Sequence, residues 1–305
     1  MPEIATAETT TDLSDSGARM VPPAPQENRF AARAFAAIMR WLVRLAALCT
    51  VAVLTFLIGY ILVKGIPNLK PSLFAWEYNS DNVSLTPALI NTVLMTFASL
   101  LIATPLGIFA AIWLVEYAKR GNRLVRIIRL TTETLQGIPS IVYGLFGMLF
   151  FVTQLGWRLS LLSGAFTMAI MVLPVVMRTT EEALIAVPDS FREGSFGLGA
   201  GKLRTVFSIV LPSAMPGILS GVILATGRIV GETAALLYSA GSVAAIPSGG
   251  DFLFDSTRTL AVHMYVLSTE GLHVGEAYGT AVVLLVLVLS INALSSFIAG
   301  RLAKK

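Results

Sequence analysis

Six long apolar runs constrain this 305-residue chain more than any other feature of its sequence. Each run is close to or above the roughly 20 residues that an α-helix needs to cross a bilayer core. Lipid offers no water to satisfy exposed backbone groups, so each run must be helical. Only 13% of the residues are charged, against about 25% in soluble domains. We therefore expect an all-α polytopic membrane protein with spans at 41–63, 87–115, 134–155, 161–177, 216–240 and 277–299.

Basic residues divide unevenly between the two ends of these runs. If both chain ends lie in the cytosol, the inner segments hold most of the basic residues, and the outer segments hold only Lys64, Lys70, Arg158 and Arg258. Cytosolic loops of membrane proteins carry an excess of Lys and Arg. The bias therefore predicts that the N-terminus and the C-terminus are both cytosolic. Residues 1–40 are then a basic cytosolic tail, expected to be disordered because its polar, Thr- and Pro-rich start has few apolar side chains to bury.

The chain offers no group of side chains suited to a metal site or to catalysis. Cys49 is the only cysteine, and His263 and His273 are isolated. We therefore predict no disulfide, no metal, no bound cofactor and no catalytic residue in this chain. The formal net charge of +4 follows from the basic inner segments, so we expect contact with membrane lipid and not with nucleic acid.

The long inner segment 178–212 predicts a helix, a glycine-rich turn and a second helix. Glycines at 197, 199 and 201 favour a chain reversal because glycine tolerates positive φ. Apolar side chains then recur at helical spacing on one predicted face: Leu203, Val206, Phe207 and Val210.

The stretch GLGAGKL in this segment is not a phosphate-binding P-loop. That motif requires glycine at 196 and serine or threonine at 203, where Phe196 and Leu203 stand, and it follows a strand. If ATP drives this protein, a partner chain must bind it.

The same segment resembles the coupling motif of permease subunits of ATP-binding-cassette (ABC) importers. That motif reads Glu-Ala-Ala, three residues, Gly, nine residues, Ile, any residue, Leu-Pro. Its spacing is kept here, with Gly and Ser in place of the two alanines: Glu193, Gly194, Ser195, Gly199, Ile209, Leu211 and Pro212. The resemblance implies that these residues dock on an ATPase subunit. It also implies that residues 87–300 form the five-helix core of type I (MetI-like) importers, preceded by one helix at 41–63. The alternative is an amphipathic loop packed on the inner face.

Three stretches resemble, more narrowly, the A-type (PstA) permease of phosphate-specific importers: ETLQGIPSIVYGLFG at 133–147, VLPVVMRTTEEAL at 172–184 and LPSAMPGILSGVILATGRIVGETAALL at 211–237. Ala235 stands where that subunit usually has proline. The resemblance implies one subunit of an ATP-driven inorganic phosphate importer in the bacterial cytoplasmic membrane. It implies as partners ABC ATPase subunits that use ATP and Mg, a second homologous permease of C-type, and an outer phosphate-binding protein.

Arg228 and Glu232 place two charges in the fifth apolar run, where one charge at the bilayer centre costs roughly 2.5–3.5 kcal/mol. The run predicts Arg228 near mid-span, and the i, i+4 spacing predicts that the two side chains pair. A guanidinium matches phosphate oxygens. We therefore interpret Arg228 as a substrate-pathway residue, Glu232 as its resting partner and Thr233 as a further polar contact. The family resemblance adds Arg178 to the pathway.

Other interpretations remain for the roles of these residues and for the function of the chain. The Arg228–Glu232 pair could brace two helices, and Arg178 could be a positive-inside anchor. Another oxyanion, such as molybdate or sulfate, could replace phosphate. A stand-alone secondary transporter predicts internal inverted repeats, which the sequence lacks, and a membrane scaffold gives no reason for Arg228.

Overall fold

The computed structural model describes residues 29–119 and 121–302, and its regular elements within these residues are all helical. The chain divides into two compact units, one up to Leu57 and one from Ile58 onward. Helix α1 (Arg29–Gly65) begins well before the predicted first span. Residues 29–40, expected to be disordered, are therefore helical, and the rest of the predicted tail lies outside the described residues.

Five helical stretches are long and apolar enough to cross a membrane: Phe35–Asn68, Thr86–Tyr117, Leu161–Ile185, Lys202–Val230 and Val274–Phe297. A sixth candidate is a bent pair of helices, Arg123–Gln136 and Ser140–Gln154. The predicted all-α, multi-span fold class is confirmed, although two of the six predicted spans differ in detail.

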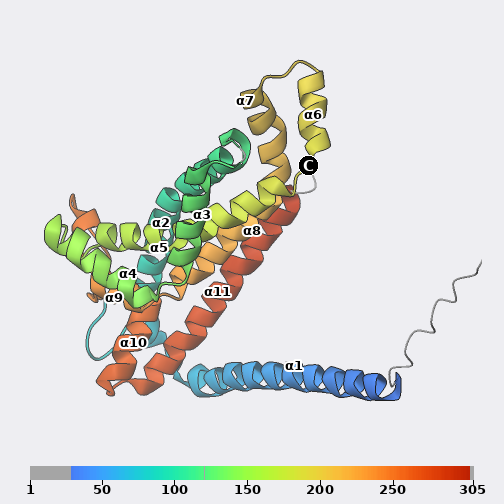
Figure 1. Cartoon of the computed structure of the whole chain (residues 1–305). Coiled ribbons are helices and arrows are strands. Elements are labelled where there is room, and N and C mark those ends of the chain that lie inside the picture. The colour runs from blue at the N-terminus through green and yellow to red at the C-terminus, as the bar shows by residue number, and fades with distance from the viewer. Residues whose placement is uncertain (1–28, 120, 303–305) are drawn as a thin grey trace, which may run out of the picture. The chain divides into compact units, whose positions relative to one another are not determined.

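The core consists of α2 (Thr86–Ile112), α5 (Leu161–Ile185) and α8 (Leu211–Val230), with α11 (Val274–Leu302) packed against α8 (Figure 1). Small residues set the spacing of these helices. A Cβ added at Gly107 would lie 2.8 Å from Val176 Cγ1, and one at Gly221 would lie 2.6 Å from Thr179 Cβ. Such close approach is the main source of helix association in lipid, where apolar burial gives little driving force.

The predicted span 134–155 is wrong as a single helix. It is divided between α3 (Arg123–Gln136) and α4 (Ser140–Gly147), and α4 continues as a π-helical segment, Met148–Gln154. The two parts meet at 102° because Pro139 lacks an N–H and disfavours a helical conformation at Ile138. The hydroxyl of Tyr143 donates to the carbonyl of Leu135 at 2.7 Å, which satisfies one group that the break leaves free.

The predicted span 216–240 is also wrong in its bounds. The helix begins at α7 (Lys202–Thr205), runs through a π-helical segment (Val206–Val210) into α8, and stops at Val230. After residues 231–233, a separate short helix, α9 (Ala234–Ser239), packs against α4. A Cβ at Gly144 would lie 2.8 Å from Ala235 Cα, so the glycine is needed for this packing.

The loop after α9 contains a helix that apolar periodicity does not reveal, α10 (Leu260–Glu270). It packs against α11 and α2, and Gly271, with φ of +74°, turns the chain from α10 into α11. The Asn91 side-chain amide donates to the carbonyls of Ala245 and Arg258, which fixes the loop on α2. The remaining helical elements are α6 (Asp189–Gly197) and the π-helical end of α2 (Trp113–Tyr117). The described residues also form three 3₁₀ turns: Ile66–Asn68, Pro71–Phe74 and Phe252–Phe254.

Candidate functional site

Arg228 lies in the last turn of α8, two residues before the helix ends, and not near the middle of a span. Within the described part of the chain its guanidinium makes no ion pair and no hydrogen bond. It lines a groove of about 570 Å³ together with Ser220 and Gly227 of α8 and Asn292 of α11. The half-buried arginine therefore keeps its donors available to a molecule in the groove.

The predicted ion pair between Arg228 and Glu232 does not form, because α8 ends between them and the i, i+4 geometry is lost. Glu232 instead accepts the backbone N–H of Ala235 at 3.1 Å, at the start of α9. A carboxylate is favourable there because the first N–H groups of a helix have no partner within the helix. A proline at 235 has no N–H to give, so the alanine permits this contact. Thr233 is the N-cap residue of α9, and its side chain makes no capping hydrogen bond.

Arg178 lies on α5 and joins it to α3. Its Nη1 donates to Glu133 at 3.1 Å, and its Nε donates to Glu182 at 3.1 Å. These side chains line a cavity of about 180 Å³ that shares no residue with the Arg228 groove. The structure therefore does not bring the two predicted pathway arginines into one site, and it gives Arg178 two carboxylate partners that the sequence did not assign.

The predicted helix, turn and helix of the coupling segment is observed as α6 and α7, which project together from the core helices (Figure 1). Of the three glycines, Gly199 alone has a positive φ, of +83°. The buried hydroxyls of Ser195 and Thr205 lie 2.8 Å apart and join the two arms. We call residues 189–205 the coupling hairpin. The residues of the coupling motif, which continues past the hairpin into α8, differ in burial: Ser195 is buried, Ile209 and Leu211 are half-buried, and Glu193, Gly194, Gly199 and Pro212 are exposed.

The tip of the coupling hairpin presents apolar side chains to the outside. Leu198 is 91% exposed, and Phe196, two residues before it, is also exposed. The predicted apolar face of the second helix is wrong: Val206 and Val210 are buried, whereas Leu203 and Phe207 are exposed. The π-helical turns at 206–210 hold more residues than an α-turn, so they change the register on which that face was predicted.

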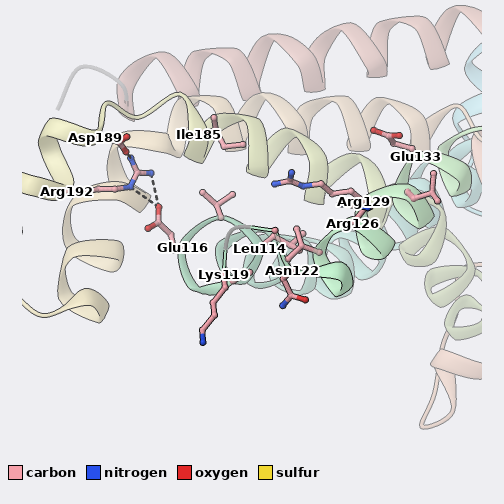
Figure 2. Close-up of a pocket in the computed structure, with 15 residues that line it drawn as sticks. Leu114, Glu116, Lys119, Asn122, Arg126, Arg129, Glu133, Ile185, Asp189 and Arg192 are labelled. Carbon is pink, nitrogen blue, oxygen red and sulfur yellow. Dashed lines mark hydrogen bonds and ion pairs between the residues drawn. The ribbon is translucent and has the colours of Figure 1, made fainter.

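Among the described residues, a cavity of about 760 Å³ lies where the ends of α2 and α5 meet α3 and α6 (Figure 2). Figure 2 shows Arg192 directed at Glu116 and Asp189. Three further basic residues line the cavity: Lys119, Arg126 and Arg129. The same part of the chain holds no cluster of three His, Cys, Asp or Glu side chains placed to bind a metal.

Two residues of these sites were missed by sequence reasoning. Asn292 is an isolated amide in the last apolar run, and Glu116 is an isolated carboxylate at the end of the second. Both are visible as polar interruptions of apolar runs, which is a signal for function or pairing in a membrane helix. Their partners come from distant parts of the chain and could not be read from the sequence.

These features define a class: a multi-pass helical membrane subunit with a projecting coupling hairpin. Solved structures agree on the fold. The inward-facing MetNI methionine ABC transporter matches with a TM-score of 0.54 at 19% identity, over 80% of this chain and 97% of that one. A bacterial alginate ABC transporter in complex with an alginate pentasaccharide-bound periplasmic protein matches with a TM-score of 0.60 at 15% identity, over 90% and 99%.

The chain belongs to the family described as binding-protein-dependent transport system inner membrane component, whose family model matches residues 103–305. It is 33% identical to the probable ABC transporter permease protein YqgI of Bacillus subtilis, over 86% of this chain and 94% of that protein. It is 37% identical to the phosphate transport system permease protein PstA 1 of Mycobacterium tuberculosis (strain CDC 1551 / Oshkosh), over 70% and 71%. It is 39% identical to PstA of Pasteurella multocida, over 61% and 67%. The predicted family is confirmed.

Proposed function

We propose that this chain is a permease subunit of an ATP-driven importer of inorganic phosphate in the bacterial cytoplasmic membrane. The observation that carries the proposal is Arg228, a guanidinium without a counter-ion in the described part of the chain, in a groove between two membrane helices. A charge in such a place is costly, so its presence in a membrane helix indicates a function. A guanidinium presents a planar fork of donors that fits the oxygens of phosphate. The similarity to named phosphate permeases favours phosphate among oxyanions.

In this proposal Arg228 is the primary contact for the anion, and Ser220 and Asn292 are the other polar side chains that line the groove. Thr233 and Glu232 flank the break that ends α8. Arg178 acts at a different depth, where Glu133 and Glu182 compete with the anion for its donors. Competition of this kind keeps binding weak, as transport requires, because a tight site would trap the ion.

The chain supplies half of a pathway and performs no ATP hydrolysis itself. A second, homologous permease of C-type completes the pathway, and an outer phosphate-binding protein delivers the anion. The exposed apolar tip of the coupling hairpin docks on an ATPase subunit, which uses ATP and Mg. With that tip in the cytosol, both ends of the chain are cytosolic, in agreement with the distribution of Lys and Arg.

The test is phosphate uptake by liposomes that contain this chain, its partner permease and its ATPase, with binding protein added outside. Arg228→Lys keeps the charge and loses the fork of donors, so we expect uptake to fall by about tenfold or more, the scale at which one misplaced contact affects transfer. Arg123→Lys is the matched control, because Arg123 is exposed and lines none of the three cavities described above.

Equal uptake by Arg228→Lys and wild type would remove Arg228 from the pathway. If the wild-type complex hydrolyses ATP in response to binding protein but moves no phosphate, the substrate assignment is wrong. Molybdate and sulfate are then measured in the same vesicles.

A further inference from the structure

Helix α2 ends in a short π-helical segment, Trp113–Tyr117, and both arms of the coupling hairpin contact its last two residues. Arg192, on the α6 arm, bonds Glu116, and Lys202, on the α7 arm, lies over the ring of Tyr117. We call these four residues the α2-end clamp. Wide π turns are frequent at functional positions of helices, which directs attention to this end of α2.

The Arg192 contact is buried and satisfied on several sides. Its Nη2 and Nε donate to Glu116 Oε1 at 2.8 and 3.1 Å, and the two side chains are only 14% and 8% exposed. The same guanidinium donates to the backbone carbonyls of Leu184 and Val187 at 2.9 and 2.8 Å, at and just after the end of α5. One side chain of α6 therefore holds α2 and α5 together (Figure 2).

The second contact comes from the other arm. The ammonium of Lys202 lies 5.0 Å from the centre of the Tyr117 ring, within the range of a cation–π interaction. The buried Ser195–Thr205 contact links the two arms between these points. The two arms of the coupling hairpin, joined to each other by this contact, therefore bind adjacent residues at the end of α2.

Chain connectivity shows why the clamp is needed. Helix α6 follows α5 after residues 186–188, and α7 leads directly into α8, so the covalent chain moves both helices with the coupling hairpin. Helix α2 has no such connection. Leu114 packs against the neighbouring helix ends, and Gly107 lies close to Val176 of α5, but apolar packing is non-directional. The charged and aromatic contacts fix α2 at defined points.

We infer that the α2-end clamp makes α2 follow the coupling hairpin during transport, with Arg192 as the positioning residue. The inference rests on the proposed function, because it requires that the hairpin be moved by an ATPase. In it, motion received at the hairpin reaches α2 through Glu116 and Tyr117, and reaches α5 and α8 through the chain itself.

The test uses the reconstituted complex and measures phosphate moved per ATP hydrolysed. Glu116→Gln keeps the shape and removes the charge that holds Arg192. In assembled complexes we expect ATP hydrolysis to continue while the transport ratio falls by about tenfold, the scale of a coupling energy between two sites. Asp189→Asn is the control, since Asp189 also bonds Arg192 but is 77% exposed and lies on the same helix as Arg192.

Two substitutions at Tyr117 test the same inference if the complex with Glu116→Gln does not assemble. Tyr117→Leu removes the ring that faces Lys202, and Tyr117→Phe keeps it. The half-exposed position tolerates both. We expect the transport ratio to fall for leucine and to stay at the wild-type value for phenylalanine.

A distance measurement reports the motion directly. Spin labels at Leu198, on the hairpin tip, and Phe109, on an exposed face of α2, are placed in a chain whose Cys49 is replaced by alanine. With an intact clamp we expect the same mean distance between the two labels with and without ATP. In the clamp variant that assembles, we expect a broader distribution of distances. A wild-type transport ratio in Glu116→Gln or Tyr117→Leu overturns the inference. If the wild-type complex hydrolyses ATP in response to binding protein but takes up no phosphate, the assignment of phosphate as the substrate is wrong. The distance measurement still tests the clamp in that case.

Discussion

The contact between Gly221 of α8 and Thr179 of α5 gives the sharpest prediction about how the core is held. A Cβ at 221 would lie 1.9 Å from Thr179 Oγ1 and 2.6 Å from Thr179 Cβ. Rotation about χ1 can move the hydroxyl but not the Cβ. Gly221→Ala therefore forces α5 and α8 apart by roughly 1 Å, because non-bonded carbon atoms prefer about 3.5–4.0 Å.

The magnitude follows from two opposing terms. Alanine favours a helix by about 0.8–1.0 kcal/mol over glycine. Overpacking a close contact costs about 1–3 kcal/mol and more where backbone must move. We expect Gly221→Ala to be destabilised by about 1–2 kcal/mol net. Gly227→Ala, in the same helix with nothing within 4 Å, gains the helix term and is stabilised by up to about 1 kcal/mol.

The assay is the thermal midpoint of monodispersity in detergent for the two variants and the wild type, followed by phosphate uptake. Arg178 is next to Thr179, so moving α5 away from α8 also displaces that arginine, and uptake falls in Gly221→Ala. Midpoints for Gly221→Ala and Gly227→Ala that agree with each other would refute the close contact. A raised Gly227→Ala midpoint with lost uptake indicates that the added Cβ obstructs the Arg228 groove, which Gly227 lines.

Three further predictions follow from single positions. Gly144→Ala places a Cβ 2.8 Å from Ala235 Cα, which is backbone and cannot yield, so the midpoint in detergent falls by an amount equivalent to about 1–3 kcal/mol; an unchanged midpoint contradicts the packing of α4 on α9. Burial, with help from the charge of Arg258 and against the carbonyl of Val83, lowers the pKa of His263 to about 4. The unfolded chain, with a histidine pKa of about 6.5, then binds the proton first, so stability falls by about 3 kcal/mol between pH 6.5 and 4. His263→Gln lacks that part of the pH dependence, and an identical pH profile in the variant argues against the buried neutral imidazole. Leu198→Glu leaves the midpoint unchanged because the side chain is 91% exposed, and it abolishes co-purification of the ATPase; retained co-purification excludes the hairpin tip from docking.

The two incorrectly predicted spans show where local sequence information ends. Apolar residues dominate 134–155 and 216–240 in spite of Pro139, Arg228 and Glu232, so hydropathy reports one span in each. The breaks arise from Pro139 in the first case and from residues 231–233 in the second. Both are tolerated because α4 and α9 pack on each other through Gly144, and because Tyr143 and Glu232 satisfy freed backbone groups.

Local sequence was sufficient for the class of fold, the family and the coupling motif, because each depends on composition or on fixed spacing within one segment. The sequence also identified Arg228 and Arg178 as charged residues in or at the end of apolar runs that are candidates for a function. Only the tertiary structure shows the partners of the charged side chains. Glu232 accepts a backbone N–H of α9, and Arg178 pairs with Glu133 of α3. Arg192 pairs with Glu116, 76 residues earlier in the chain. The physical reason is that a helix forms from contacts within a few residues. An ion pair between distant segments instead forms only where tertiary packing brings their side chains together.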